Sequence, residues 1–522
     1  LDQLAVLPAM KYDYDVLSIG CGPAGISVGG LGGAMGLRTL VVDMRPRSGG
    51  ECMNSGCIPS KAYLRRGEIM RHVKQHVPEE LWDQIIEEPV TEPLQDDLTE
   101  IAGRKMDKML KGVEKRWNTR AEFVDAHTVR LIPVTGTHSP NLGNGEDTCA
   151  TELVTADKIF IGVGTAPFVP DCPGLREIKH GRLLTNEEIF HVEPKFRVAV
   201  LCGGVISMEL SEALCSLGCE VTIIHRSPNL RVGNGVPKHV SDMIEAKLVE
   251  KGVRVIHPCT MEGWTQHPET HALTCTLASG EIIDCDYVLS ACGRRPVNDT
   301  LNLSAAGVTT NAKGFIEVDK YLRTKTKNIF APGDSNGHYL LSHAAMHQGM
   351  IAIMNAMLPI KINFKNFPVP ATIFTDPNVS TVGMQKGTLD EKGIKYLEFT
   401  QTFESYGATY AQGLKEGQVT IYCSKMGKIY GALVVGNHSG ELINELSLAM
   451  TWGIRMHKLA FRQGSFPTVG WLTGRVGQLW MQHYAEKPAM QKMAGAVYRH
   501  GFKMAVAAGT AVAAGAALWI AL

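Results

Sequence analysis

The sequence predicts an α/β protein with two Rossmann-like three-layer units, on the evidence of two segments. Residues 15–19 form a short apolar strand that runs into Gly20-Cys21-Gly22-Pro23-Ala24-Gly25 and then into an apolar, helix-like stretch. Residues 197–201 form a similar strand, again followed by a turn rich in small residues. A glycine-rich turn between a strand and a helix is typical of units that bind dinucleotides. With 522 residues, the chain is long enough for several domains.

The first unit carries the full dinucleotide fingerprint. Gly20, Gly22 and Gly25 occupy its three glycine positions, which let the backbone approach a pyrophosphate at the amino end of a helix. A second predicted strand at 39–42 ends in Asp43, an acid at the spacing that suits a ribose hydroxyl. The first unit is therefore predicted to bind a dinucleotide.

Two cysteines, Cys52 and Cys57, lie in a glycine-rich approach to a predicted helix. Positions five apart on a regular helix are separated by about 7.5 Å of rise. Disulfide partners need Cα atoms within about 7 Å, so a bridge between these cysteines requires a distorted turn. The first turn of a helix also lowers the pKa of a thiol. The pair is therefore predicted to undergo thiol–disulfide exchange.

Together these motifs resemble the flavoprotein disulfide reductases, such as dihydrolipoamide dehydrogenase, glutathione reductase and mercuric reductase. The resemblance covers roughly residues 11–475 and includes further segments in family order, namely 156–167, 293–296, 331–334, 374–377 and 434–443. It implies an FAD domain at 11–170 and 295–365, an NAD(P) domain at 185–294, and an α+β dimerisation domain at 366–475. It also implies a homodimer. Residues 476–522 lie beyond the resemblance and are predicted to form a linker and an apolar C-terminal helix.

The resemblance assigns roles to individual residues. Cys57 is expected to face the flavin and Cys52 to meet the substrate, while Lys61 lies beside the flavin and pairs with Glu209. The implied FAD-binding residues are Gly20, Gly22, Gly25, Asp43, Gly50, Lys61, Gly164, Asp334 and Ser342.

The second dinucleotide turn departs from the fingerprint. Aligned on Glu209, its three glycine positions are Cys202, Gly204 and Ser207. Cysteine at the first position is the more serious change, because a tight turn favours a residue without a Cβ atom. Nucleotide binding is therefore expected to persist in a weakened form.

The type of nicotinamide cofactor is indicated by the end of the next predicted strand. An NAD enzyme would place an acid there, whereas this chain has His225 and Arg226, followed by Arg231. Cations suit a 2′-phosphate, so the pattern favours NADPH over NADH, although the three residues could also be solvated loop residues. The implied NADP-binding residues are Gly204, Ser207, His225, Arg226, Arg231 and Gly293.

The C-terminal catalytic dyad of the family is missing. Where these enzymes usually carry His-Pro-Thr-x-x-Glu, the chain has Phe466-Pro467-Thr468-Val469-Gly470-Trp471. In the family, the partner subunit's histidine deprotonates the incoming dithiol, and neither phenylalanine nor tryptophan can move a proton. His483 lies shortly downstream as a possible substitute base. Mercuric reductases manage without this histidine, but the extra metal-binding cysteines of that class are missing here.

Two functions remain open. The first is a membrane-associated FAD-dependent NAD(P)H oxidoreductase with a redox-active Cys52–Cys57 disulfide and an acceptor other than an ordinary dithiol. The alternative is a catalytically degenerate FAD-binding subunit with a structural or regulatory role in a membrane complex. The complete redox motif favours the enzyme, whereas the lost dyad and the altered second turn favour the subunit.

Composition excludes other classes of function. The formal net charge is zero, and no basic stripe with interleaved aromatic residues indicates nucleic acid as a partner. The thirteen cysteines have no zinc-like spacing, so no metal site is expected. Apart from Cys52 and Cys57, most are interpreted as buried small residues in a reducing compartment, namely Cys149, Cys172, Cys202, Cys215, Cys219, Cys259, Cys275, Cys285, Cys292 and Cys423.

The two ends suggest a location. The chain begins at Leu1, consistent with a removed targeting peptide, a trimmed chain or missing residues. Residues 504–522 carry no charge, follow Arg499, His500 and Lys503, and are long enough to cross a bilayer. The alternative is an Ala-rich helix packed against soluble protein. We expect an organelle membrane, with mitochondria favoured over plastids.

Overall fold

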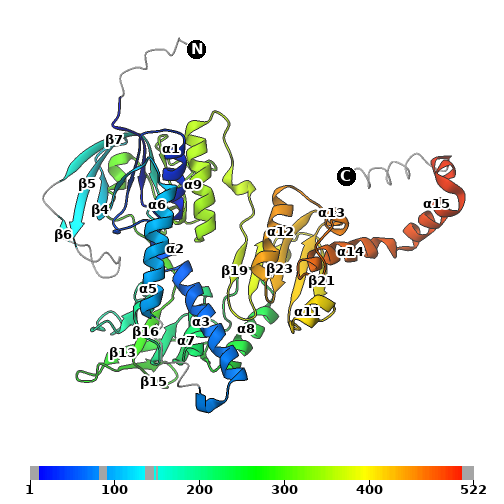
Figure 1. Ribbon diagram of the computed structural model, residues 1–522, viewed down its shortest axis with the longest axis horizontal. Coiled ribbons are helices and arrows are strands. Elements are labelled where there is room, and N and C mark those ends of the chain that lie inside the picture. Colours follow the sequence, from blue (N-terminus) through cyan, green and yellow to red (C-terminus); the bar gives the residue numbers. More distant parts are fainter. Residues whose placement is uncertain (1–10, 82–90, 136–145, 148–150, 508–522) are drawn as a thin grey trace, which may run out of the picture. The chain divides into compact units, whose positions relative to one another are not determined.

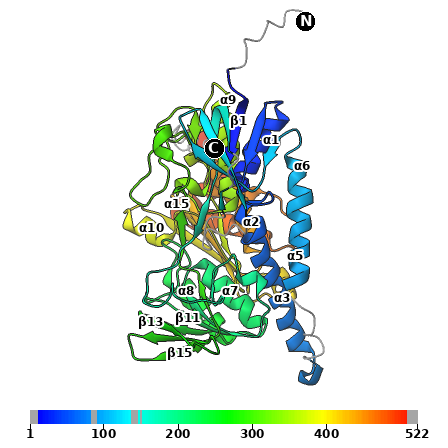
Figure 2. The same ribbon diagram turned by 90° about the vertical axis from the view of Figure 1, so that its left-hand side faces the viewer.

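The computed structural model describes residues 11–81, 91–135, 146–147 and 151–507. The chain forms two compact units. The larger comprises 1–233, 238–367 and 373–375, and the smaller comprises 234–237, 368–372 and 376–522. The sheets of the two units are separate (Figures 1 and 2), and each unit buries its own apolar core.

A mixed sheet forms the first half of the larger unit. Its strand order is β3 (Glu114–Arg116), β2 (Thr39–Val42), β1 (Tyr14–Ile19), β7 (Glu152–Ile161), β5 (Thr128–Thr135) and β4 (Thr119–Phe123), with β18 (Ile329–Phe330) on β7 and β6 (Glu146–Asp147) on β5. The strands from β3 to β7 and β18 are parallel, whereas β5 and β4 run antiparallel. All residues of β2 are buried, as expected for a parallel strand covered on both faces.

Helix α1 (Pro23–Ala34) follows β1 and packs beside α9 (Ser342–Met357), as Figure 1 shows. A Cβ atom on Gly25 would lie 1.9 Å from the carbonyl oxygen of Gly20. Only glycine fits there, so α1 can begin directly at the carboxyl end of β1. This close approach places the amino end of α1 at the edge of the sheet.

A second, fully parallel sheet has the order β12 (Arg254–Ile256), β11 (Glu220–Ile224), β10 (Arg197–Leu201), β16 (Tyr287–Ser290) and β9 (Leu183–Leu184). Helices α7 (Val205–Ser216) and α8 (Lys238–Glu250) connect its strands. An antiparallel sheet of β13 (Met261–Gln266), β14 (Leu273–Leu277) and β15 (Ile282–Cys285) adjoins it through a shared apolar core. Strands β8 (Thr165–Pro167) and β17 (Arg294–Pro296) pair with each other. Two Rossmann-like sheets, as the sequence predicts, therefore lie in one unit.

Helices α2 (Gly50–Asn54) and α3 (Cys57–His76) follow the first sheet, and α3 packs along α7 of the second (Figure 2). Arg71 on α3 forms an ion pair of 3.3 Å with Glu212 on α7 and donates a hydrogen bond to Ser216. Further along lie α5 (Thr91–Glu100), a π-helical segment (Ile101–Met106) and α6 (Asp107–Met109). Short 3₁₀ turns complete the unit at Glu79–Leu81, Ile189–His191, Leu303–Ala306, Asp334–Asn336 and Phe364–Asn366.

The smaller unit is an antiparallel sheet with helices. Its strand order is β19 (Ala371–Ile373), β20 (Val379–Gly383), β23 (Ile429–Val435), β22 (Gln418–Cys423) and β21 (Leu397–Thr402). Helices α12 (Ser439–Thr451), α13 (Met456–Phe461) and α14 (Trp471–Ala485) bury their apolar faces against the sheet in one core. Helices α10 (Lys386–Glu391) and α11 (Gly407–Ala411) lie between strands in sequence. This is the α+β organisation predicted for the C-terminal domain.

The predicted membrane tail at 504–522 lies outside the described residues from 508 onward. The last described helix, α15 (Pro488–Ala507), is largely exposed, with Tyr498 92% accessible. Within the ranges that the structure describes, no helix is both long and apolar enough to cross a membrane. The apolar C-terminal helix therefore stays a prediction.

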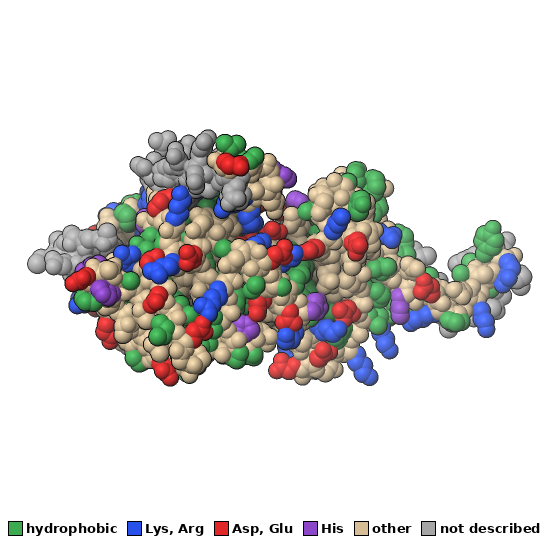
Figure 3. All heavy atoms as spheres, turned by 90° about the horizontal axis from the view of Figure 1, so that it is seen from below, with side chains coloured by type: hydrophobic (Ala, Val, Ile, Leu, Met, Phe, Trp, Pro, Cys, Tyr) green, Lys and Arg blue, Asp and Glu red, His purple; other side chains and the backbone are tan. Residues whose placement is uncertain are grey.

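Charged side chains of both signs are interspersed over the face in Figure 3. This distribution accords with the formal net charge of zero.

Candidate active site

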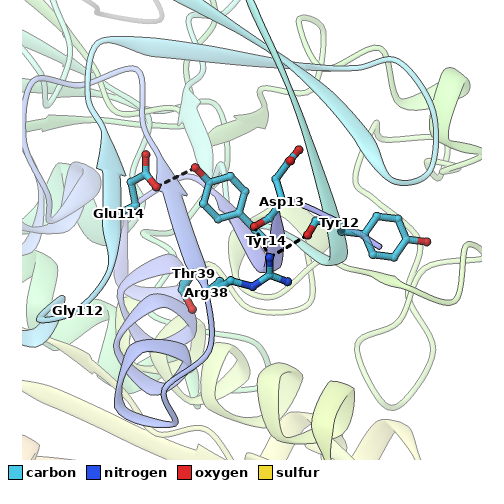
Figure 4. A pocket seen from close by; sticks show the side chains of 7 residues that line it. All are labelled: Tyr12, Asp13, Tyr14, Arg38, Thr39, Gly112 and Glu114. Atoms are coloured by element: carbon cyan, nitrogen blue, oxygen red, sulfur yellow. Dashed lines mark hydrogen bonds between the residues drawn. The ribbon is translucent and has the colours of Figure 1, made fainter. Parts of the chain in front are cut away.

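A surface pocket of about 590 Å³ lies at the amino end of β1 (Figure 4). Its polar groups already bind one another: Tyr14 donates a hydrogen bond of 2.8 Å to Glu114, and Arg38 donates hydrogen bonds of 2.9 Å to the backbone carbonyls of Tyr12 and Asp13. The glycine turn lies at the opposite end of β1, because it follows Ile19. The pocket is therefore remote from the predicted chemistry, and we assign it no catalytic role.

The redox pair lies where two helices meet at a break. Helix α2 ends at Asn54 and α3 begins at Cys57, with Ser55 and Gly56 between them outside helical geometry. A Cβ atom on Gly56 would lie 3.0 Å from the Glu51 carbonyl oxygen and 3.4 Å from the Cys52 Cα. Glycine therefore lets α2 fold back toward α3 and brings the two thiols together. This is the distorted turn that the spacing of the cysteines requires.

Cys57 lies in surroundings that favour its thiolate. Its sulfur accepts a hydrogen bond from the Cys52 thiol, which is the main cause that lowers the pKa of Cys57. The Ser342 hydroxyl, 3.0 Å from this sulfur, and the Lys61 ammonium lower the pKa further, whereas burial and Glu209 oppose them. The pKa of Cys52 is raised, chiefly by the same hydrogen bond. The two thiols are thus unequal, and Cys57 is the one that loses its proton.

Lys61 and Glu209 form the predicted pair. The Lys61 Nζ lies 2.7 Å from the Glu209 Oε2, and the Glu209 side chain is only 6% exposed. The other carboxylate oxygen accepts a hydrogen bond of 2.9 Å from the Phe374 backbone amide. The Lys61 ammonium also lies 4.4 Å from the centroid of the Phe374 ring. Glu209 on α7 therefore fixes a cation one helical turn after Cys57.

A second ion pair holds α2, and the sequence analysis missed it. Glu51, which precedes Cys52, accepts a hydrogen bond of 2.6 Å from Arg294 Nη1, and the other oxygen contacts Arg294 Nη2. Asn186 donates to both Glu51 and the Ser55 carbonyl. Arg294 also donates to Thr165, which in turn donates a bond of 3.3 Å to Asp334. The two charges are far apart in sequence, so only the folded structure reveals this network.

The amino end of α1 suits the pyrophosphate of a dinucleotide. Its N-cap is Gly22, no side chain caps it, and its first turn holds no acidic residue. Uncapped amide groups at a helix amino end bind anions. A Cβ atom on Gly50 would lie 2.6 Å from the Gly22 Cα, so the two glycines pack together at this end.

The other residues predicted to bind FAD have the following surroundings. Asp43 accepts hydrogen bonds from the backbone amides of Cys21 and Arg45, at 2.5 and 2.8 Å. Burial raises the pKa of Asp334 to about 6, although the hydrogen bond from Thr165 and the charge of Arg294 oppose this rise. A Cβ atom on Gly164 would meet nothing within 4 Å. The Ser342 hydroxyl lies 3.0 Å from the Cys57 sulfur. The residues present thus fit FAD.

At the second turn, the predicted NADP residues fall into two groups. Gly204 caps α7 without a side-chain cap, and Arg226 and Arg231 are exposed beyond β11. The backbone amide of Arg231 donates to the Gly203 carbonyl, so this loop lies against the turn.

Ser207 and His225, in contrast, face inward. The Ser207 hydroxyl donates to the Leu201 carbonyl and is fully buried. The two ring nitrogens of His225 lie 3.1 Å from the Gly203 amide and the Asn229 carbonyl. Burial lowers the pKa of His225, which favours its neutral form. These two side chains support the turn, and a direct contact with NADP stays a prediction for both.

The interpretation of Cys202 and Cys292 as buried small residues is wrong. The two form a disulfide with Cα atoms 5.2 Å apart, and both are partly exposed. Cys202 follows β10 and Cys292 follows β16, and these parallel strands are neighbours. The signal in the sequence was partial, because Cys202 comes directly after the predicted strand at 197–201, whereas the strand before Cys292 was not predicted. The other described cysteines are free, and Cys149 lies outside the described residues.

In the smaller unit, the two dyad positions lie side by side. The Phe466 and Trp471 rings meet edge to face at 5.7 Å, and Phe466 is 69% exposed. The nearby Glu445 carboxylate is held by Arg462 and Thr473. His483 lies twelve residues beyond Trp471 on α14, about 18 Å along the axis, and packs against Phe399. His483 is therefore too far from the dyad positions to replace the missing base there.

Known proteins resemble the chain in sequence and in fold. The family model "Pyridine nucleotide-disulphide oxidoreductase" matches residues 14–349, and the model of its dimerisation domain matches 369–472. The chain is 27% identical over 453 residues to a mercuric reductase of Staphylococcus aureus, covering 86% of this chain and 79% of that protein. It is 28% identical over 444 residues to a dihydrolipoyl dehydrogenase of Chlamydia pneumoniae, covering 84% and 91%. The fold matches an HOCl-induced flavoprotein disulfide reductase, RclA, of Escherichia coli, with a TM-score of 0.75 and 21% identity over 90% of this chain and 99% of that one.

Proposed function

The chain belongs to the pyridine nucleotide-disulphide oxidoreductase family, and from this premise we propose that it passes electrons from NADPH through Cys52 and Cys57 to an acceptor that requires no base on the protein. The family is FAD-dependent and uses NAD(P)H, and its dimerisation domain supports a homodimer. The observation that carries the proposal is a thiolate site at Cys57 in a chain with Phe466 in place of the usual histidine.

The residues around Cys57 support electron transfer to and from a disulfide. FAD, when bound, supplies a two-electron acceptor for hydride and a donor to the disulfide. Lys61 places a positive charge near the Cys57 sulfur, and Glu209 fixes that lysine. Ser342 stabilises the thiolate by a hydrogen bond, which keeps Cys57 deprotonated while Cys52 holds the proton. Cys52 is then the thiol that meets the acceptor.

The lost dyad limits the choice of acceptor. A base that deprotonates an incoming dithiol contributes about 10²- to 10⁴-fold to the rate. Neither Phe466 nor Trp471 can accept this proton, and Arg462 and Thr473 already hold the Glu445 carboxylate. Ordinary dithiols and disulfides should therefore turn over slowly. An acceptor that takes electrons without a proton, such as a soft metal ion, avoids this barrier.

NADPH is the proposed reductant because of charge. Arg226 and Arg231 are exposed at the carboxyl end of β11, where a ribose 2′-phosphate would lie. Guanidinium groups bind phosphate through paired hydrogen bonds. Replacing both arginines with alanine should weaken NADPH binding much more than NADH binding, as measured by equilibrium fluorescence titration. Equal losses for both nucleotides would refute the proposed preference.

Stopped-flow spectroscopy with a panel of acceptors tests the proposed function. NADPH should bleach the flavin absorbance and then produce the long-wavelength band of a thiolate beside oxidised flavin. Hg²⁺ should restore the oxidised spectrum faster than lipoamide or glutathione disulfide does. A Cys52→Ser variant should lose this turnover while it still binds FAD. Rapid lipoamide turnover, or no flavin bleaching by either nucleotide, would refute the proposal.

The second candidate is a subunit with a structural or regulatory role in a membrane complex. The absent base and the cysteine in the nucleotide turn favour it. Stoichiometric copurification with membrane proteins, without flavin bleaching, would support this candidate over the enzyme.

We also propose attachment to an organelle membrane, mitochondrial rather than plastid, through residues 504–522, because this stretch is uncharged and follows basic residues. Truncation after Lys503 should release the protein on carbonate extraction, and a full-length protein that is already extracted would refute the attachment. Colocalisation with a mitochondrial marker tests the compartment.

A further inference from the structure

The Cys202–Cys292 disulfide closes the carboxyl edge of the second parallel sheet. Strands β10 and β16 run side by side with Leu201 paired to Ser290. Cys202 follows Leu201 directly, and Cys292 comes two residues after Ser290. The bond therefore joins residues that lie just beyond the carboxyl ends of two neighbouring strands.

This edge is where a dinucleotide binds in such a sheet. In the strand order β12-β11-β10-β16-β9, the chain proceeds from β10 to one side through β11 and β12 and then returns to the other side at β16. Ligands bind outside the carboxyl ends of the strands at such a switch point. The amino end of α7, capped by Gly204 alone, opens at the same place. A Cβ atom on Gly204 would meet nothing within 4 Å, so the approach to these amides is open. The disulfide thus lies at the edge of the sheet where a dinucleotide is expected to bind.

The disulfide also holds a backbone conformation that cysteine disfavours. Cys202 has φ of +73°, a left-handed conformation that glycine adopts freely and other residues adopt at a cost. The Cys202 amide donates a hydrogen bond of 2.9 Å to the Ile224 carbonyl, as the amide of a glycine at this position could. A cross-link to Cys292 restrains this conformation, whereas a free cysteine can relax from it. The turn should therefore be held in its binding shape only while the bond is intact.

The same segment connects to the first redox pair. Cys292 and Gly293 lead into β17, where Arg294 forms its ion pair with Glu51 beside Cys52. This connection anchors the segment that carries Cys292 on the side of the redox helices. The mobile partner in the reduced state is then the Cys202 turn rather than the Cys292 segment.

We propose that Cys202 and Cys292 are a second dithiol–disulfide pair, reducible by a small or protein dithiol, whose oxidation holds the turn in the conformation that binds a nicotinamide dinucleotide. A thiolate of the dithiol attacks one sulfur of the bond, which forms a mixed disulfide and releases the other cysteine as a thiolate. The second thiol of the dithiol then attacks the mixed disulfide and releases the first cysteine. The dithiol becomes a disulfide, and its two electrons and two protons pass to the Cys202 and Cys292 thiols. This inference rests on the proposed function only in that a nicotinamide dinucleotide binds.

The test uses full-length FAD-loaded protein with Cys52→Ser and Cys57→Ser, so that dithiothreitol acts on the second pair. Differential alkylation with peptide mass spectrometry first reports whether Cys202 and Cys292 are bonded before reduction and free after it. NADPH affinity is then measured by fluorescence titration in both states. The oxidised protein should bind roughly 5- to 30-fold more tightly, the factor that corresponds to the cost of a left-handed non-glycine residue.

Two variants separate the turn from other effects of reduction. Cys292→Ser leaves Cys202 without a partner and should bind weakly in both states. Cys202→Gly restores the glycine turn and should bind tightly in both states. Cys259→Ser, which removes a partly exposed cysteine of the same unit, is the control and should keep the difference between states. Flavin content reports that each variant is folded.

Some outcomes overturn this inference alone. These are free Cys202 and Cys292 thiols in the oxidised protein, or equal affinities in the two states while Cys202→Gly binds NADPH. Failure of every form, Cys202→Gly included, to bind NADPH or NADH would overturn both this inference and the proposed function.

Discussion

Removing the Ser342 hydroxyl should raise the pKa of Cys57. The hydroxyl lies 3.0 Å from the Cys57 sulfur, and its hydrogen bond stabilises the thiolate relative to the thiol. Ser342→Ala deletes this donor and leaves the Cys52, Lys61 and Glu209 side chains in place. The thiol should then keep its proton to higher pH.

The size of the shift follows from the contact. A hydrogen bond to a charged group contributes about 1.5–3 kcal/mol. Sulfur is a weak acceptor and Ser342 is only partly buried, so the lower end applies. Because one pKa unit corresponds to about 1.4 kcal/mol, the pKa of Cys57 should rise by about one unit.

The assay uses a Cys52→Ser background, in which Cys57 stays a free thiol beside oxidised flavin. Serine at position 52 keeps a hydroxyl donor for the Cys57 sulfur. The long-wavelength absorbance of the thiolate is followed against pH, and its midpoint should move upward in Ser342→Ala. Ser342→Thr is the matched control, because it retains the hydroxyl and should leave the midpoint near its starting value. An unchanged midpoint in Ser342→Ala, with normal FAD content, would refute the reasoning.

Three further variants test the site and its support. Phe466→His combined with Trp471→Glu should raise lipoamide turnover by about 10²-fold or more, since it restores a base and its orienting acid; steady-state rates no higher than those of the single variants would contradict this. Glu209→Gln turns an amide toward the Lys61 ammonium and should lower the free energy of unfolding by about 1–2 kcal/mol in urea, because that lysine is 35% exposed. Gly67→Leu should separate α3 from α7 and cost about 1–3 kcal/mol, because a Cβ atom there already lies 2.9 Å from the Ser216 Cβ. Unfolding midpoints equal to that of the parent would count against the packing argument.

Local patterns in the sequence were enough to predict the two Rossmann-like sheets and the break between α2 and α3. A glycine turn between a strand and a helix has few structural solutions, so Gly20, Gly22 and Gly25 locate the amino end of α1. The spacing of Cys52 and Cys57 required a break, and α2 and α3 meet at that break. In each case the constraint lies within a short stretch of chain.

Interactions between distant segments could not be predicted in this way. The Glu51–Arg294 ion pair joins residues 243 apart, and nothing in either segment names the other. The contact of Ser342 on helix α9 with the Cys57 sulfur had no signal in either segment, and its contact with FAD stays a prediction. His225 was read as a cation for phosphate, whereas burial favours a neutral ring beneath the turn. Side-chain direction at the end of a strand depends on neighbouring elements that the sequence alone does not place.

Helix α3 couples the orientation of Cys57 to packing contacts far from the redox pair. It is one continuous helix of twenty residues, about 30 Å long, with Cys57 and Lys61 at one end and Arg71 near the other. A slip of one residue along α7 would turn every side chain on α3 by about 100°. Cys57 would then point away from Ser342, although no residue near the redox pair had changed. The direction in which the Cys57 side chain points is thus set by contacts on α3 more than three helical turns away. Variation at Arg71 should therefore affect redox chemistry as much as folding.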